Sequence, residues 1–188
     1  METKGGIFME TMKAIQERRS VRSYHPRQIP EEVLKEILEA ALMAPTAMNR
    51  QAWHFTVIQD ASFLDRLVEI NAKGCVNAGL EPPEEGTHNF YHAPTAVLLS
   101  YETADENAGL NCGAAVENML LAARSFGVAS VFLGSLGFLF TTEEAEELKK
   151  QCGIPENYSY CCAVALGYPS GEWPEAPERN REVFTFIK

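Results

Sequence analysis

A cluster of basic side chains lies near the start of the chain. Arg18, Arg19 and Arg22 fall within the segment ERRSVRSY, and Ser20 stands among them. The planar guanidinium group of arginine binds phosphate through two parallel hydrogen bonds, and a serine hydroxyl adds a neutral donor. The cluster therefore indicates a phosphate site. The alternative is a solvated basic patch at the end of a helix, where cations are favoured by the helix dipole.

A second basic pair lies in the tail, where Arg179 and Arg181 alternate in ERNREVFTF. Alternate residues of an extended segment point to the same side. Alone, the pair is typical of solvated surface arginines among glutamates. The chain, however, has 16 Lys and Arg against 26 Asp and Glu, a net charge of −10. An anion site in such a chain must gather its cations locally, so the two basic segments together indicate one shared anion.

The segment APTAMNRQAWHF, residues 44–55, carries two primary amides two positions apart, Asn49 and Gln51. Pro45 and Thr46 precede them, directly after a predicted helix. An amide side chain offers a donor and an acceptor at fixed positions, so the pair suits the edge of a planar heterocycle. The alternative is loop capping, in which these side chains bond to nearby backbone.

A glycine-containing segment, FLGSLGF at residues 132–138, follows a predicted strand. Glycine at such a position lets backbone N–H groups approach a ligand closely. Leu133 and Gly134 are the residues nearest the strand end. An ordinary glycine-containing loop without a ligand explains the segment equally well.

The residue types of a protein-borne acid–base or metal site are not arranged in recognisable motifs. No HExxH or HxH pair occurs among His25, His54, His88 and His92. No CxxC occurs among Cys75, Cys112, Cys152, Cys161 and Cys162, which are expected to be buried thiols in a reducing cytoplasm. No nucleophile elbow GxSxG is present. We therefore predict no catalytic side chain and no metal ligand, and a cofactor that carries the chemistry.

Composition excludes several classes of protein. The chain has 188 residues, 46% hydrophobic and 22% charged, which suits one globular domain over residues 1–188. No apolar run is long enough to cross a membrane, and the acidic balance argues against nucleic acid and anionic membranes as partners. Residues 1–9 do not form a secretory signal and are expected to be a loose leader.

Periodicity predicts helices over residues 10–19, 30–44, 61–72, 107–128 and 142–151, and strands over 53–59, 95–102, 129–134 and 158–169. The second helix should bury one stripe, made of Leu34, Ile37, Leu38, Ala41 and Leu42. No GxGxxG follows a strand, so a doubly wound dinucleotide fold is not supported. We expect an α+β fold with a mixed, mostly antiparallel sheet flanked by helices, and an extended tail over residues 171–188.

Two segments call for a special explanation. The helix at 107–128 is apolar almost all round, with Glu117 and Asn118 as exceptions, so it should lie at the centre of a larger body, such as a dimer. Residues 74–94 lack a pattern and carry Phe90 and Tyr91. A segment of this length is expected to be functional, mobile or both, and the alternative is a disordered surface loop.

Four of these pieces, in this order, resemble the FMN-dependent nitroreductase family. They are RRSVRSY, APTAMNRQAWHF, GAAVENMLLAA and the basic pair of the tail, and the resemblance runs from Ile15 to Lys188. It implies a nitroreductase-like sandwich that forms an intertwined homodimer, with FMN at the interface. The chain departs from the family at Ala52, where many members have proline. It leaves open whether Asn71 or Asn77 contacts the flavin. It also implies that residues 74–94, with Phe90 and Tyr91, border the pocket of the acceptor beside the flavin.

The resemblance also implies which residues bind FMN. Contacts to the phosphate or ribityl chain fall on Arg18, Arg19, Ser20, Arg22, Arg179 and Arg181. The loop that reaches the flavin from the partner subunit carries Pro45, Thr46, Asn49 and Gln51. The backbone of Leu133 and Gly134 runs along the ring, where an N–H can bond the flavin N5.

The implied activity is a ping-pong hydride transfer from NAD(P)H through FMN to a nitroaromatic, a quinone or a similar flat acceptor, in the cytoplasm. Related chemistries remain open, among them enone reduction, dehalogenation, dehydrogenation and cleavage of flavin. A flavin-binding sensor or carrier without turnover is the alternative from another class of protein.

Overall fold

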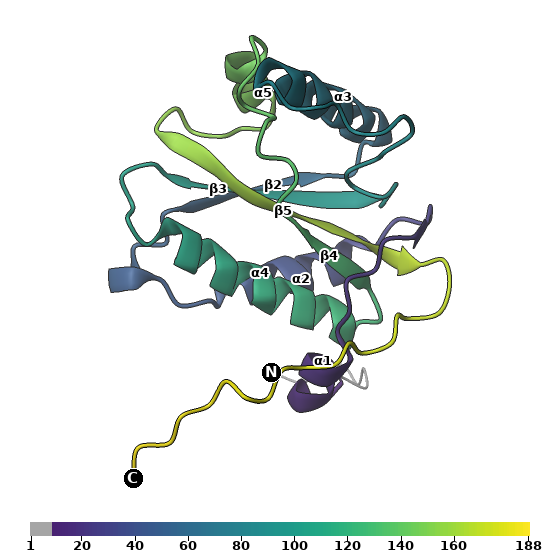
Figure 1. The fold of residues 1–188 in the computed structure, drawn as a ribbon, viewed down its shortest axis with the longest axis vertical. Helices are drawn as coiled ribbons and strands as arrows, with labels where there is room; N and C mark the ends of the chain where they lie inside the picture. The colour runs from purple at the N-terminus through teal and green to yellow at the C-terminus, as the bar shows by residue number, and fades with distance from the viewer. Residues whose placement is uncertain (1–8) are drawn as a thin grey trace.

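The computed structural model describes residues 9–188, in which five strands form one sheet with helices on both faces (Figure 1). The predicted leader lies, apart from Met9, outside the described residues. The helices are α1 (Thr11–Glu17), α2 (Glu31–Leu42), the single 3₁₀ turn η1 (Ala47–Asn49), α3 (Ala61–Asn77), α4 (Ala108–Ser125) and α5 (Ala145–Gln151). The strands are β1 (Tyr24–His25), β2 (Trp53–Ile58), β3 (Thr95–Glu102), β4 (Ala129–Leu133) and β5 (Tyr158–Pro169). No helix in this part of the chain is long and apolar enough to cross a membrane.

The strand β5 is the centre of the sheet. It pairs with β3 along one edge and with β4 and β1 along the other, and β2 pairs with the far side of β3. All of these pairings are antiparallel, which confirms the predicted α+β fold with a mostly antiparallel sheet. Most of β3 and the middle half of β5 are buried because helices cover both faces of the sheet.

Successive residues of β3 face two different hydrophobic cores. Ala96 and Leu98 pack into the core beneath α3 and α5, whereas Val97 and Leu99 pack against α2 and α4. This alternation follows from the period of two along a strand. Figure 1 shows the resulting layers, with α3 and α5 on one face of the sheet and α2 and α4 on the other.

The apolar stripe of α2 is narrower than predicted. Leu34, Ile37 and Ala41 are buried and Leu38 is partly buried, but Leu42 is 43% exposed. A helix advances about 100° per residue, which places Leu42 about 80° from Leu34. The predicted burial of Leu42 is therefore wrong, because this position lies at the edge of the face that meets the sheet.

The helix α3 extends to Asn77, five residues beyond its predicted end at residue 72. Gly74 lies inside the helix, where a Cβ atom would come within 2.3 Å of the carbonyl oxygen of Phe138. The glycine is present because the backbone of Phe138 packs directly on α3, and not because the helix ends there. The irregular segment therefore begins at Ala78.

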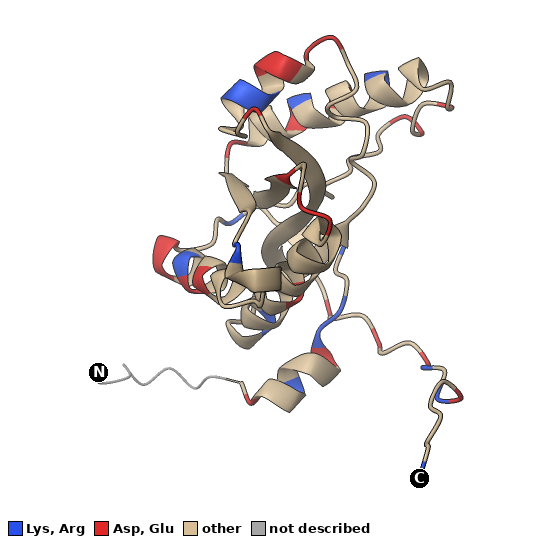
Figure 2. Ribbon diagram, turned by 90° about the vertical axis from the view of Figure 1, so that its left-hand side faces the viewer, with Lys and Arg blue, Asp and Glu red and all other residues tan. Residues whose placement is uncertain are grey.

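The tail beyond β5 forms an arm without helix or strand, residues 171–188. Figures 1 and 2 show the arm leaving the body beside α1. Its last residues are apolar and exposed, with Phe184 at 73%, Phe186 at 80% and Ile187 at 97% of their full accessibility. Such a segment leaves a large apolar area uncovered within one chain.

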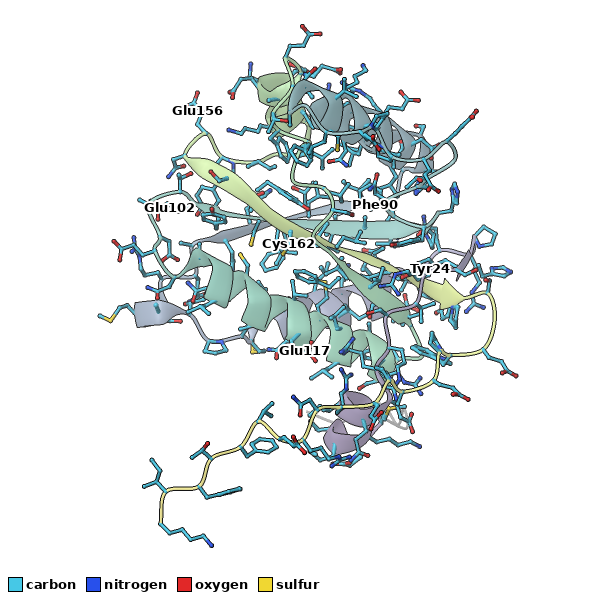
Figure 3. The ribbon with its side chains drawn as sticks, in the orientation of Figure 1. Tyr24, Phe90, Glu102, Glu117, Glu156 and Cys162 are labelled. Carbon is cyan, nitrogen blue, oxygen red and sulfur yellow. The ribbon has the colours of Figure 1, made fainter. Side chains whose placement is uncertain are left out.

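Phe90 is fully buried and packs in the core between the sheet and α3 (Figure 3). The turn that follows it places Tyr91 and His92 in the left-handed region, with φ of 55° and 54°. This turn directs Phe90 inward and leaves Tyr91 half-buried. The prediction that Phe90 borders an acceptor pocket is therefore wrong, and the residue anchors its segment to the core.

Replacing Phe90 by alanine should lower the free energy of unfolding by about 3–5 kcal/mol, because it removes a buried aromatic ring and leaves a cavity. Urea denaturation followed by circular dichroism measures the change. Leu80→Ala is the matched control, since Leu80 lies in the same segment but is 52% exposed, and it should change stability by less than about 0.5 kcal/mol. Equal small effects of the two substitutions would contradict the anchoring role.

Candidate functional site

The basic segment after α1 is held beside the sheet by backbone hydrogen bonds. α1 ends at Glu17, and the N–H of Val21 donates to the carbonyl of Ser130 on β4 at 3.0 Å, next to a bridge between Ser20 and Ser130. Tyr24 fixes the turn that follows, because its buried hydroxyl donates to the carbonyl of Val21 at 2.7 Å. Burial raises the pKa of Tyr24 far above its ordinary value, so the phenol stays a neutral donor.

Arg124 brings α1, α4 and the start of the tail together. Its Nη2 lies 2.6 Å from Oε2 of Glu17, and its Cζ lies 4.1 Å from the centre of the Trp173 ring. Just before this point, the N–H of Ser170 donates to the carbonyl of Ser23 at 3.2 Å. These contacts direct the tail across the segment that follows α1.

The result is a cavity of about 410 Å³ that gathers four arginines from both basic segments. Its walls are formed by Arg18, Arg19, Ser20, Arg22, Pro174, Glu175, Pro177 and Arg179. An adjoining cavity is lined by Arg19, Arg179 and Arg181. The structure therefore brings together all six residues that the sequence analysis assigns to a phosphate. We refer to this region as the arginine cavity.

Several guanidinium groups of the arginine cavity are only partly paired. Arg18 Nε lies 3.4 Å from Glu117 Oε1, a contact that lacks hydrogen-bond geometry, and Arg19 Nη1 donates to the carbonyls of Gln16 and Arg18 at 2.7 Å. The Nε atoms of Arg18 and Arg19 are buried without a hydrogen-bond acceptor. Buried donors of this kind are costly unless an acceptor is supplied, and a phosphate supplies several. The cavity thus fits a phosphate-bearing ligand.

The amide-rich loop between α2 and β2 is strained and partly self-capped. Met48, Asn49 and Gln51 have positive φ, at 55°, 54° and 49°, although none is glycine. Gln51 Nε2 donates to Asn49 Oδ1 at 3.0 Å, and the N–H of Gln51 donates to Thr46 Oγ1 at 3.1 Å. Backbone held in this region is a common feature of ligand-binding sites. Loop capping therefore occurs, and it leaves the side chains of Asn49 and Gln51 exposed.

Within one chain, this loop does not meet the arginine cavity. The N–H of Ala47 donates to Asn111 Oδ1 at 3.2 Å, at the start of α4. The arginine cavity meets α4 further along, where Arg18 contacts Glu117. Asn111 and Glu117 are six residues apart, or about 9 Å along a helix at 1.5 Å per residue, and no residue of the loop lines the cavity. Pro45, Thr46, Asn49 and Gln51 are thus separate from the arginines.

The end of β4 carries the predicted glycine loop. Leu133 is buried, whereas Gly134 is exposed, and a Cβ atom there would meet open space. Asn71, 1% exposed on α3, donates from Nδ2 to the carbonyl of Ser135 at 3.1 Å and accepts at Oδ1 from the N–H of Phe138 at 3.3 Å. Asn71 therefore positions this loop through both ends of its amide.

Sequence reasoning missed two residues that position the site, Arg124 and Trp173, and left the role of Asn71 open. A signal existed for Asn71, which stands on the apolar face of α3 between Ile70 and Gly74, where a polar side chain must find internal partners. Asn77, the other candidate, is exposed at the end of α3. Arg124 and Trp173 lack a sequence signal, because their contact joins segments 49 residues apart.

Comparison with protein families gives a match over most of the chain. The model of the Nitroreductase family matches residues 15–168. Nitroreductase NfnB of Mycolicibacterium smegmatis is 40% identical over 197 residues, covering 83% of this chain and 81% of that protein. A protein of Archaeoglobus fulgidus, provisionally named NADH dehydrogenase/NAD(P)H nitroreductase, is 37% identical over 164 residues and covers 87% of each chain.

Solved structures agree with this match. A nitroreductase with bound FMN from Bacteroides fragilis superimposes with a TM-score of 0.86 at 34% identity, covering 96% of this chain and 100% of the other. A nitroreductase with bound FMN from Desulfitobacterium hafniense gives a TM-score of 0.85 at 31% identity, covering 97% and 100%.

Proposed function

This chain belongs to the nitroreductase family, and we propose that its arginine cavity holds the phosphate of FMN. The family and its FMN-bound members make the chain an FMN-dependent oxidoreductase. The observation that carries the placement is the cavity itself. It collects four arginines in a chain of net charge −10, and two of their Nε atoms are buried without an acceptor.

The residues present fit FMN in two respects. Arg18, Arg19, Ser20, Arg22, Arg179 and Arg181 would hold its phosphate and ribityl chain. Gly134 offers open backbone beyond β4 for the isoalloxazine ring, and Asn71 keeps that backbone in place. When bound, FMN supplies the hydride-transfer chemistry that the side chains lack.

We infer that the functional unit is a homodimer with shared sites. The amide-rich loop contacts the first turn of α4, whereas Arg18 of the arginine cavity contacts Glu117 beyond the middle of that helix. This separation supports a site in which the loop comes from the partner subunit. α4 also presents an outward face with few charges, on which Leu110 is 78% exposed. The apolar end of the arm, residues 183–187, adds further surface for a partner to cover.

The reaction proposed is a ping-pong transfer from NAD(P)H to a nitroaromatic, a quinone or a similar flat acceptor. Its support is the NAD(P)H nitroreductase named among the relatives. The chain would act as one domain in a reducing cytoplasm, consistent with five cysteines that form no disulfide.

Purified protein should be yellow, and NADH or NADPH should bleach its flavin absorbance in the absence of oxygen. Addition of menadione or a nitroaromatic should restore the colour, because donor and acceptor use the same cofactor in turn. Stopped-flow absorbance measures both half-reactions. Bound flavin that neither nucleotide bleaches would instead identify a flavin-binding sensor or carrier.

Arg18→Ala and Arg179→Ala should each weaken FMN binding by about 1.5–3 kcal/mol, the contribution of a hydrogen bond to a charged group. Fluorescence titration of the FMN-free protein measures the dissociation constants. Riboflavin affinity should change little in either variant, because riboflavin lacks the phosphate. Arg66→Ala is the matched control, since Arg66 pairs with Glu144 on the opposite side of the sheet. Equal losses for FMN and riboflavin would contradict the phosphate assignment.

Subunit complementation tests the shared site. One chain carries Arg18→Ala and Arg22→Ala, and the other carries Asn49→Gly and Gln51→Gly, which remove the amides but suit the left-handed backbone. Each variant alone should bind little FMN. The heterodimer, isolated with two affinity tags, should bind one FMN per two chains, because one of its two sites contains only intact residues.

If both groups of residues served one flavin within a single chain, the heterodimer would bind no more FMN than its parents. A monomer in sedimentation velocity that retains FMN would also contradict the shared site.

A further inference from the structure

A cluster of three potential metal ligands lies outside the arginine cavity, where α3 meets the turn before β3. Among residues 9–188, Asp65, His88 and His92 place one ligand atom each within 4.8 Å of one another. No motif in the sequence indicates this site, because Asp65 and His88 are 23 residues apart and the two histidines lie on an irregular turn. We propose that these three side chains bind a divalent transition-metal ion of the zinc type.

One pair of ligand atoms already has a spacing that suits such an ion. His88 Nε2 and Asp65 Oδ1 are 3.1 Å apart, close to the separation of two ligands in a tetrahedral zinc site with bonds of about 2.0–2.2 Å. The rings of His88 and His92 have centroids 4.1 Å apart and are inclined by 37°. Neutral imidazole and carboxylate are ligands that zinc accepts in proteins.

The three side chains also share one cavity. Asp65, His88 and His92 line a space of about 230 Å³, which Gln28 and Pro94 border as well. It leaves room for a water molecule as fourth ligand.

Binding must move one proton within His88. The N–H of His92 donates to His88 Nδ1 at 3.2 Å, so the neutral ring carries its proton on Nε2 and donates it to Asp65. Coordination by Nε2 transfers that proton to Nδ1 without net release, and the hydrogen bond from the His92 N–H is lost. The turn at His92 must therefore shift, which lets the His92 ring approach the ion.

The test is a calorimetric titration of chelator-treated, FMN-loaded protein with Zn²⁺. Wild type should bind one ion per chain at this site. His92→Asn should raise the dissociation constant for Zn²⁺ at least about tenfold. Loss of a residue that only hydrogen-bonds to a metal ligand already lowers metal affinity by about 10- to 100-fold, and loss of a ligand should cost no less. Asparagine tolerates the left-handed backbone of position 92, so this variant should keep its fold, as unchanged FMN content will verify. Asp65→Asn should weaken binding in the same direction.

His54→Gln is the matched control, because His54 lies on β2 beside Gly153 and outside the cluster. It should leave the affinity unchanged. Zinc-edge X-ray absorption should show imidazole and oxygen ligands, and the amide resonance of His92 should shift on binding. Sulfur ligands would assign the ion to the free cysteines and overturn the proposal, as would unchanged affinity in His92→Asn and Asp65→Asn.

Discussion

The pairing of β5 with three other strands is the constraint on which the rest of the structure depends. β5 runs for 12 residues and accepts β3 along one edge, with β4 and β1 in succession along the other. The position of β4 then determines where the segment after α1 can lie, because Val21 bonds to Ser130. Gly134 directly follows the last residue of β4. The arginine cavity and the glycine loop therefore occupy two ends of one short strand, with their separation determined by strand register.

The helix layers on the two faces of the sheet differ in how much apolar surface they expose. The face under α3 and α5 is closed by the chain itself, with Phe90 and the contact of Gly74 on Phe138 sealing its core. The face under α2 and α4 is also covered, but the outer side of α4 exposes Leu110. A domain that buries one face completely and leaves the other helix layer uncovered is suited to pairing through that layer.

The fold was largely predictable because its elements have clear local patterns. The strand from Thr95 to Glu102 was predicted with its observed bounds, and the amphipathic period of α2 located that helix to within two residues at each end. The order of the basic and amide motifs indicated the family, which the comparison confirms. These signals are local, so each can be read from a short segment without knowing which distant residues it contacts.

What could not be predicted depends on contacts between distant segments. Asn71 bonds residues 64 and 67 positions away, and Gly74 is required by the backbone of Phe138 on the same loop. Glycine is ordinarily evidence for a helix end. The sequence therefore predicted an irregular segment from residue 74, whereas α3 continues to Asn77. Likewise, an aromatic residue in an unpatterned segment looks available to a ligand, whereas a left-handed turn directs Phe90 into the core.

The left-handed backbone at Met48, Asn49 and Gln51 has a consequence for the rate of association. Each such residue stores of order 1 kcal/mol or more of strain. The rest of the fold offsets this strain when the chain folds, before any ligand binds. A glycine-rich loop would relieve the strain but would have to be ordered at every encounter. The loop in this chain has already lost that freedom, so capture of a ligand sacrifices less conformational entropy and is less subject to delay by a search among loop conformations.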